Sequence, residues 1–336
     1  MPPEVIATVA DFCDLQSVLN LRLTSSELGE HAENVLDADR RAMLRHFVTD
    51  AEILWEHFEN YGAVVGGLAA LSFVLRDASM LPDSLDVFVT MDQAEFLEQM
   101  LDEDPDLDLR LTGTVDRGPS QDFITPRHTS RVATFLCPNG RLLKLCTLST
   151  QSVLDPIVVA PTTALMNWVS PHAFGCAYPT LTLKRRALSG SISAYAPGVA
   201  ALYLVLKTHG FERMRSPWCW PEYAALVPPS KRTWFKPCLS ALFLCPQQGR
   251  FFGDEGSLIN VFDLQSTNHD ELRTLHQPPY GVSVGWRLWF GGQRGCDGHC
   301  KVRDPLLPEG VVTVAAVMVT RRIQFRATFV DPRADV

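Results

Sequence analysis

Two adjacent glycines between apolar segments constrain the fold of this chain more than any other feature of its sequence. Residues 61–65 have the composition of a short buried strand, Gly66-Gly67 forms a turn, and residues 68–75 begin an apolar helix. Pro82-Asp83 ends that helix, and residues 85–89 form a second apolar strand. Strands and helices alternate closely here, which predicts a sheet covered by helices.

The alternation continues to about residue 210. The expected elements are a helix capped by Asp92, an acidic turn at 102–108, a hairpin of strands 131–137 and 141–148 around the turn 138–140, a strand at 181–183, a helix at 194–208 that ends at Gly210, and a strand-like segment at 310–330. This order predicts an α+β fold with a mixed sheet, preceded by a helical module.

The N-terminal module has a dense helical period. The apolar residues of its first helix, which begins near Pro2 and Pro3, are Val5, Ile6, Val9 and Phe12. Asp14 is placed to cap a second helix that carries Leu15, Val18 and Leu19, and residues 24–26 offer the next cap. Because short helices cannot hide an apolar stripe alone, these helices must pack on each other or on a partner.

The domain organisation follows from the next segment. Residues 38–58 have the apolar positions of one continuous helix, and no Gly/Ser-rich or Pro-rich stretch interrupts them. We therefore expect a helical module over residues 1–47, a linker helix over 48–60, and a domain with a C-terminal extension over 61–336.

The order of residues in the N-terminal module resembles the F-box. The segments that carry the resemblance are Met1-Pro2-Pro3-Glu4-Val5-Ile6, residues 15–19 and Leu21-Arg22-Leu23-Thr24-Ser25, with Met1 where the family prefers leucine. The resemblance implies binding to the Skp adaptor of a cullin-based ubiquitin ligase. Its adaptor-facing residues would be Pro2, Pro3, Val5, Ile6, Leu15, Val18 and Leu23. The alternative is a helical cap on the following domain.

Residues 64–70 and 84–89 resemble the nucleotidyltransferase fold. That family places two small residues at a strand-to-helix turn, so that the backbone approaches a triphosphate, and two carboxylates two residues apart on the next strand. The resemblance implies that Gly66, Gly67, Ser84 and Asp86 line the nucleotide site, with Mg²⁺ if the protein is active.

This sequence departs from the family at the metal-binding positions. Position 84 is serine, and Asp83 is odd-spaced from Asp86, so it would point to the other face of a regular strand. The strand expected at 141–148 carries Lys144 and no carboxylate. A lone carboxylate holds magnesium poorly. We therefore expect no catalytic residue, or Asp86 alone if the domain is active, and a catalytically degenerate domain.

Three functions fit these patterns. The first is an F-box adaptor that links a client protein to the ligase through the degenerate domain. The second is a nucleotidyltransferase that uses Asp86 with an unconventional metal site. The third is a folded protein whose N-terminal helices only stabilise it. Residues 162–168, 176–182 and 245–254 resemble a family of fungal proteins that couple such a fold to an F-box-like start, with no established activity to carry over.

Composition narrows the partners and the compartment. The formal net charge of −8 disfavours nucleic acid, and no uncharged apolar stretch of about 18 residues predicts a membrane span. Nine scattered cysteines and the absence of a signal-like start indicate reduced thiols in the cytoplasm or nucleus. Cys296, His299 and Cys300 form a tight cluster without a known zinc spacing. The basic stretch 184–186 is either a phosphate contact or a solvated turn.

Overall fold

An eight-stranded mixed sheet organises the part of the chain that the computed structural model describes, which is residues 3–116, 129–150, 152–189, 197–226, 239–245, 248–262, 284–286, 288 and 312–313. Its strands, in spatial order, are β11 (Leu258–Val261), β7 (Ala173–Cys176), β6 (Asn167–Val169), β1 (Val64–Val65), β2 (Ser84–Thr90), β5 (Leu142–Leu148), β4 (Thr129–Leu136) and β3 (Arg110–Asp116). Strands β2 and β5 are parallel, and the other neighbours in this sheet are antiparallel. The fold is α+β, as expected.

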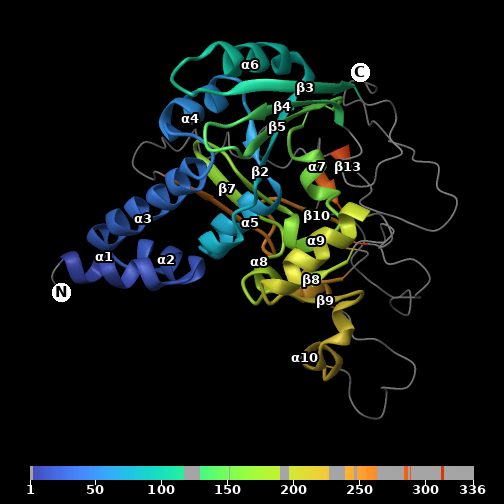
Figure 1. Ribbon diagram of the computed structural model, residues 1–336. Coiled ribbons are helices and arrows are strands. Elements are labelled where there is room, and N and C mark those ends of the chain that lie inside the picture. The colour runs from blue at the N-terminus through green and yellow to red at the C-terminus, as the bar shows by residue number, and fades with distance from the viewer. Residues whose placement is uncertain are drawn as a thin grey trace, which may run out of the picture.

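Helices cover both faces of this sheet (Figure 1). The helices on the first face are α3 (Ser26–Arg45), α4 (Ala51–Asn60), α5 (Gly67–Leu75) and α6 (Met91–Glu103), preceded by α1 (Pro3–Phe12) and α2 (Leu15–Arg22). The helices on the second face are α7 (Asp155–Val158), α8 (Pro179–Thr182) and α9 (Pro197–Thr208), whereas α10 (Pro221–Ala224) lies away from the sheet at the lower end of the molecule in Figure 1. Two small sheets complete the described structure: β10 (Arg250–Phe251), β12 (Val284–Trp286) and β13 (Val312–Thr313), and β8 (Arg186–Leu188) with β9 (Glu212–Met214).

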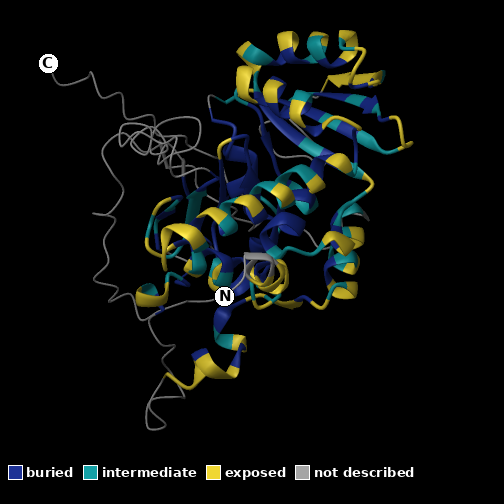
Figure 2. Ribbon diagram, turned by 90° about the vertical axis from the view of Figure 1, so that its left-hand side faces the viewer, coloured by how far each residue is buried: buried dark blue, intermediate teal, exposed yellow. Residues whose placement is uncertain are grey.

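Strand β2 shows why the sheet has two cores. Successive side chains of a strand point to opposite faces. Val87 therefore joins the first core, which contains Leu36 and Phe58 from the helices, whereas Phe88 joins the second core with Trp168. Figure 2 shows the interior strands as largely buried, while the helices keep exposed outer faces.

Local signals placed many of these elements correctly. The strand before Gly66, helix α5, strand β2 and the β4–β5 hairpin all occur where the sequence predicts them. Asp14 caps α2 by accepting a hydrogen bond from the Ser17 N–H at 2.8 Å, and Ser25 caps α3 through the Leu28 N–H at 3.3 Å. Side-chain caps of this kind satisfy backbone donors that the first turn of a helix leaves free.

Two expected elements and one expected cap are wrong, and one strand was not expected. Asp92 does not cap a helix but lies inside α6, whose N-cap is Thr90. Residues 38–58 do not form one helix, because α3 ends at Arg45 and Asp50 caps a new helix through the N–H groups of Glu52 and Ile53. Phe47 and Val48 of the break are buried in the first core. The segment 181–183 is not a strand, since helix α8 begins at Pro179. Strand β3 was not expected; its residues are almost all exposed and lack the alternation of a half-buried strand.

The first core continues across the expected boundary at residue 47. It contains Leu15 and Val18 of the N-terminal helices together with Val87 and Leu145 of the sheet. The helical module and the sheet therefore share one hydrophobic core. Of the strand-like segment expected at 310–330, only β13 lies within the described residues.

Candidate functional site

Helix α1 carries an apolar stripe that its own fold leaves uncovered. Val5, Val9 and Phe12 are spaced by four and three residues, so they lie on one helix face. Their exposed fractions are 45%, 48% and 88%. Leu23, just after α2, is 83% exposed. Apolar side chains this exposed are a feature of interaction surfaces when they cluster. We call Val5, Val9 and Phe12 the α1 stripe.

The other predicted adaptor-facing residues are placed differently. Leu15 and Val18 are wholly buried in the first core, where they pack against the other helices. Their apolar character thus serves packing within this chain, and a partner could not reach them without unfolding the module. Pro3 and Ile6 belong to α1, and the structure does not describe their side chains; Pro2 lies outside the described residues.

Arg22 fastens the N-terminal helices to the edge strand β11. Its guanidinium, which is almost fully buried, pairs with Glu33 of α3 at 2.8 Å. The same group donates to the side chain of Asn260 at 2.6 Å and to the backbone carbonyls of Val261 and Phe262. Five N–H donors in one planar group allow this many simultaneous contacts.

Two more arginines strengthen the attachment. Arg76, at the end of α5, donates to Asp39 of α3 at 2.7 Å and to the carbonyls of Ala10 and Cys13 at 2.6 and 2.5 Å. Arg40 of α3 donates to the carbonyl of Pro171, and its guanidinium lies 4.9 Å from the centroid of the Phe262 ring. The α1 stripe is thereby carried by helices held firmly against the sheet.

A second candidate site surrounds Asp86 on the second face of the sheet. Gly66 donates its N–H to the Asp86 carbonyl at 3.0 Å, and Gly67 has a φ of +64°, in the left-handed region. A Cβ on Gly67 would lie 2.7 Å from Asp86 Oδ2. The Asp86 carboxyl therefore lies directly against the first turn of α5, in a space that requires glycine.

Lys144 is the register partner of Asp86. The two residues face each other across the parallel strands β2 and β5. Burial raises the pKa of the Asp86 carboxyl above its ordinary range, and the nearby Lys144 opposes that rise. Both side chains retain some solvent exposure. Ser84 lies two residues earlier on the same face, and its buried Oγ has no hydrogen-bond partner within the described structure.

These residues do not fit a magnesium ion. Mg²⁺ takes about six oxygen ligands in near-octahedral geometry and is normally bound through one or more carboxylates. Asp86 is the one carboxylate of β2 and β5, and a lysine stands beside it. Throughout the described ranges, no group of three or more His, Cys, Asp or Glu side chains could hold a metal ion. The metal expected from the nucleotidyltransferase resemblance has no ligand set here.

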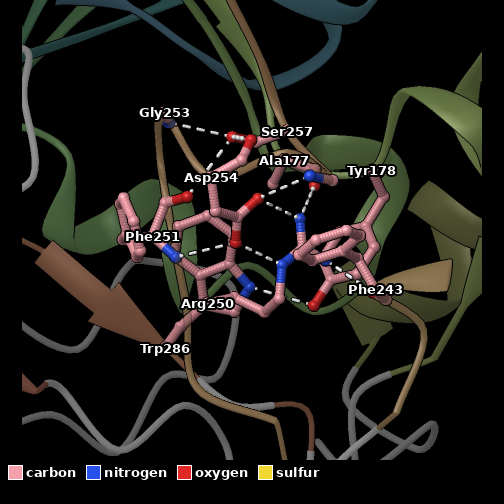
Figure 3. Close-up of polar contacts among 10 residues, drawn as sticks. Ala177, Tyr178, Phe243, Arg250, Phe251, Gly253, Asp254, Ser257 and Trp286 are labelled. Carbon is pink, nitrogen blue, oxygen red and sulfur yellow. Dashed lines mark hydrogen bonds and ion pairs between the residues drawn. The ribbon is translucent and has the colours of Figure 1, made fainter. Parts of the chain in front are cut away.

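A third cluster, around Arg250, is buried and fully partnered (Figure 3). Arg250 is 1% exposed and donates to Asp254 through Nε at 2.5 Å and Nη2 at 2.9 Å. It also donates to the carbonyls of Phe243 and Ala177 at 2.5 and 3.0 Å. Its guanidinium lies within 4.7 to 5.7 Å of the ring centroids of Tyr178, Phe243 and Trp286. With every direction occupied, this cluster is structural.

Residues 245–254 stand out in the sequence only through a resemblance, and the Arg250–Asp254 pair was not predicted. The spacing of four residues between opposite charges was the available signal. The contacts with Ala177 and Phe243 come from elsewhere in the chain and have no local signature.

The remaining candidate residues either form ion pairs within the chain or lie outside the described residues. Arg185 pairs with Asp77 at 2.7 Å and Arg186 pairs with Glu222, so two of the three basic residues at 184–186 form ion pairs within the chain. Cys296, His299 and Cys300 lie outside the described residues. No helix in the described part is both long and apolar enough to cross a membrane. Comparison of the chain with protein-family models, with curated proteins and with solved structures finds no match.

Proposed function

We propose that this chain is an F-box-like adaptor, which binds the Skp component of a cullin ubiquitin ligase through the α1 stripe and presents a client protein on its sheet domain. The observation that carries the proposal is the α1 stripe itself. Phe12 leaves 88% of its surface exposed at the end of a helix whose sequence is similar to the start of an F-box.

The attachment of the helices supports the same function. A substrate receptor must hold its client at a defined position relative to the ligase. The contacts of Arg22 and Arg76 join the N-terminal helices to the sheet through buried or nearly buried guanidinium groups. Hydrogen bonds to charged groups contribute about 1.5–3 kcal/mol each when buried. A module held in this way presents the stripe and the sheet in one fixed relation.

The structure changes the set of residues that we expect to contact the adaptor. Val5 and Leu23 stay in the set because both are exposed, and Val9 and Phe12 join it. Leu15 and Val18 leave it, since their side chains are core. Contact energy at an interface concentrates in a few aromatic and large apolar residues, so Phe12 is the expected centre of the contact.

The test is binding of the full-length protein to a purified Skp adaptor, measured by calorimetry. Two variants are compared with the parent: Val9→Asp/Phe12→Asp, which charges the stripe, and Leu204→Asp, which charges an exposed leucine on α9. We expect binding by the parent and by Leu204→Asp, and at least about a tenfold weaker Kd for the stripe variant, because hot-spot losses exceed about 1.4 kcal/mol.

Circular dichroism and the melting temperature establish that the variants fold. The adaptor proposal fails if the folded parent does not bind, or if the stripe variant binds as tightly as the parent. The N-terminal helices would then be a structural cap on the sheet.

A further inference from the structure

Helix α9 is apolar on every side, yet part of it is exposed. Residues 198–206 carry no charged side chain, and the Tyr203 hydroxyl is their only polar side-chain group. A helix that is hydrophobic all round is normally covered all round. Leu206 is buried, but Leu204 leaves 62% of its surface exposed. The exposed residues of this stretch, which lie next to one another on the helix surface and which we call the α9 face, are Ala200, Ala201 and Leu204.

Two basic side chains flank the α9 face. Lys207 follows Leu204 by three residues and Tyr203 by four, so it lies beside both on the helix surface. Arg213 of β9 lies over the Tyr203 ring, with its guanidinium carbon 3.9 Å from the ring centroid. The Tyr203 hydroxyl donates to the carbonyl of Pro161 at 3.2 Å, which fixes the position of the ring. Arg213 is therefore positioned beside α9 by a ring that is itself anchored.

Neither of these cations has an anionic partner within the described part of the chain. Lys207 and Arg213 are exposed, and neither side chain forms a hydrogen bond or an ion pair with another described residue. The acidic residues nearby, Glu212 and Glu222, both pair with Arg186. A guanidinium stacked on an aromatic ring keeps its N–H donors at its edge. Both cations are thus available to an external carboxylate.

The segment that carries the α9 face is basic in an acidic protein. Residues 184–222 hold six Lys and Arg and two Asp and Glu, which gives +4 against −8 for the whole chain. A local positive region attracts an acidic partner. Nucleic acid fits less well, because the rest of the chain repels a long polyanion and because the exposed apolar side chains have no counterpart in a phosphate backbone.

We propose that the α9 face is a docking surface for an acidic amphipathic segment of a partner protein. The apolar side chains of that segment cover Ala201 and Leu204, and its carboxylates pair with Lys207 and Arg213. An apolar centre with a polar rim is the usual anatomy of a protein interface, and arginine can bind a carboxylate through two parallel hydrogen bonds. The surface is separate from the α1 stripe, since α9 lies well away from α1 in Figure 1.

The experiment measures binding of the full-length protein to fluorescent probes by anisotropy. The first probe is a synthetic peptide of five Glu-Ala-Leu-Glu repeats, and the second has lysine in place of each glutamate. Single-stranded polyuridine of the same length tests nucleic acid as the alternative occupant. Three variants are compared with the parent: Leu204→Asp, which charges the apolar face; Lys207→Glu/Arg213→Glu, which reverses the two cations; and Arg45→Glu/Arg110→Glu, which reverses two exposed arginines on α3 and β3.

We expect the parent to bind the acidic peptide with a Kd below about 1 mM. Leu204→Asp should weaken this Kd by at least about tenfold, because it places a charge at the centre of the contact. Lys207→Glu/Arg213→Glu should lose the acidic peptide. It should also bind the lysine peptide more tightly than Arg45→Glu/Arg110→Glu, which has the same net charge. The latter variant should bind the acidic peptide like the parent.

Four results would overturn the proposal, once circular dichroism has shown that each protein is folded. They are a parent that does not bind the acidic peptide, a Leu204→Asp variant that binds it as tightly as the parent, two double variants with equal affinity for it, and a parent that binds polyuridine more tightly than the peptide. None of these results bears on adaptor binding, which involves α1 and which Leu204→Asp is expected to retain.

Discussion

The carboxyl groups of Asp86 and Asp254 differ in how many hydrogen bonds they accept from the rest of the protein. Asp254 accepts two hydrogen bonds from Arg250 and two from backbone N–H groups, those of Phe251 at 3.2 Å and Gly256 at 3.0 Å. The Asp86 carboxyl accepts none from the described residues, although Lys144 is the register partner of Asp86. Buried polar groups in native proteins are nearly always satisfied. The Asp254 carboxylate is therefore fully used by the fold, whereas the partly exposed Asp86 carboxyl has no hydrogen-bond partner among the described residues.

The largest effect should come from breaking the saturated pair. Arg250→Met leaves Asp254 buried without its countercharge, and loss of one partner of a buried pair costs about 3–5 kcal/mol. Urea unfolding followed by tryptophan fluorescence measures the change in the free energy of unfolding. The double variant Arg250→Met/Asp254→Leu, which leaves no charge, should recover part of the loss. A single variant within about 0.5 kcal/mol of the parent would contradict the structural role of this pair.

An intermediate effect should come from the turn beside Asp86. Gly67→Ala places a residue with a Cβ in the left-handed region, which costs about 1–2 kcal/mol, and sets that Cβ against Asp86 Oδ2. Combining it with Asp86→Ala should restore the steric part of the loss, so the two changes should be less than additive.

Gly113→Ala is the matched control for that experiment. A Cβ on Gly113 meets nothing within 4 Å, so its free energy of unfolding should stay close to that of the parent. Strict additivity of the Gly67 and Asp86 changes would show that the carboxyl does not lie against the turn.

The smallest effect should come from Asp86→Asn, with a change of less than about 1 kcal/mol. Burial raises the pKa of Asp86 above its ordinary value of 3.8. The folded state then binds the proton more tightly than the unfolded chain, so the contribution of this group to stability is full below pH 3.8 and is lost as pH rises through the folded pKa. Asp86→Asn escapes this loss, and its stability relative to the parent should rise with pH.

The contribution of Asp14 to stability depends on pH in the opposite direction. Hydrogen bonds from the side chain and backbone of Ser17 lower the pKa of Asp14 below 3.8. Its contribution is present above pH 3.8 and is lost as pH falls through the folded pKa. Asp14→Ala should cost about 0.5–2 kcal/mol at pH 7 and less in acid. Melting temperatures from pH 3 to pH 8 test both trends, and parallel curves for the two variants would refute the contrast.

The sequence predicted what neighbouring residues determine. The Gly66-Gly67 turn, the β4–β5 hairpin and the caps at Asp14 and Ser25 each depend on residues close in the chain, and all were placed correctly. The lysine at position 144 was also visible in the sequence, but its place opposite Asp86 depends on the parallel pairing of β2 and β5.

What the sequence did not reveal depends on distant contacts. The sequence pattern of an apolar residue on a short helix does not show whether the residue packs in the core or faces a partner. The sequence therefore did not show that Leu15 is in the core and Phe12 at the surface. Strand β3 is recognisable only through its pairing with β4, since its residues lack an apolar pattern.

The contacts of Arg22 have a consequence for synthesis of the chain on the ribosome. Its carbonyl acceptors at Val261 and Phe262 lie 239 and 240 positions later in the chain. At about 5–20 residues per second, they emerge roughly 12–48 s after Arg22 itself. During that interval Arg22 lacks its acceptors on and next to β11, and the apolar residues of the first helices are accessible to chaperones or to an early partner. The N-terminal helices can form their native contacts with the sheet edge only after residues 260–262 have been synthesised.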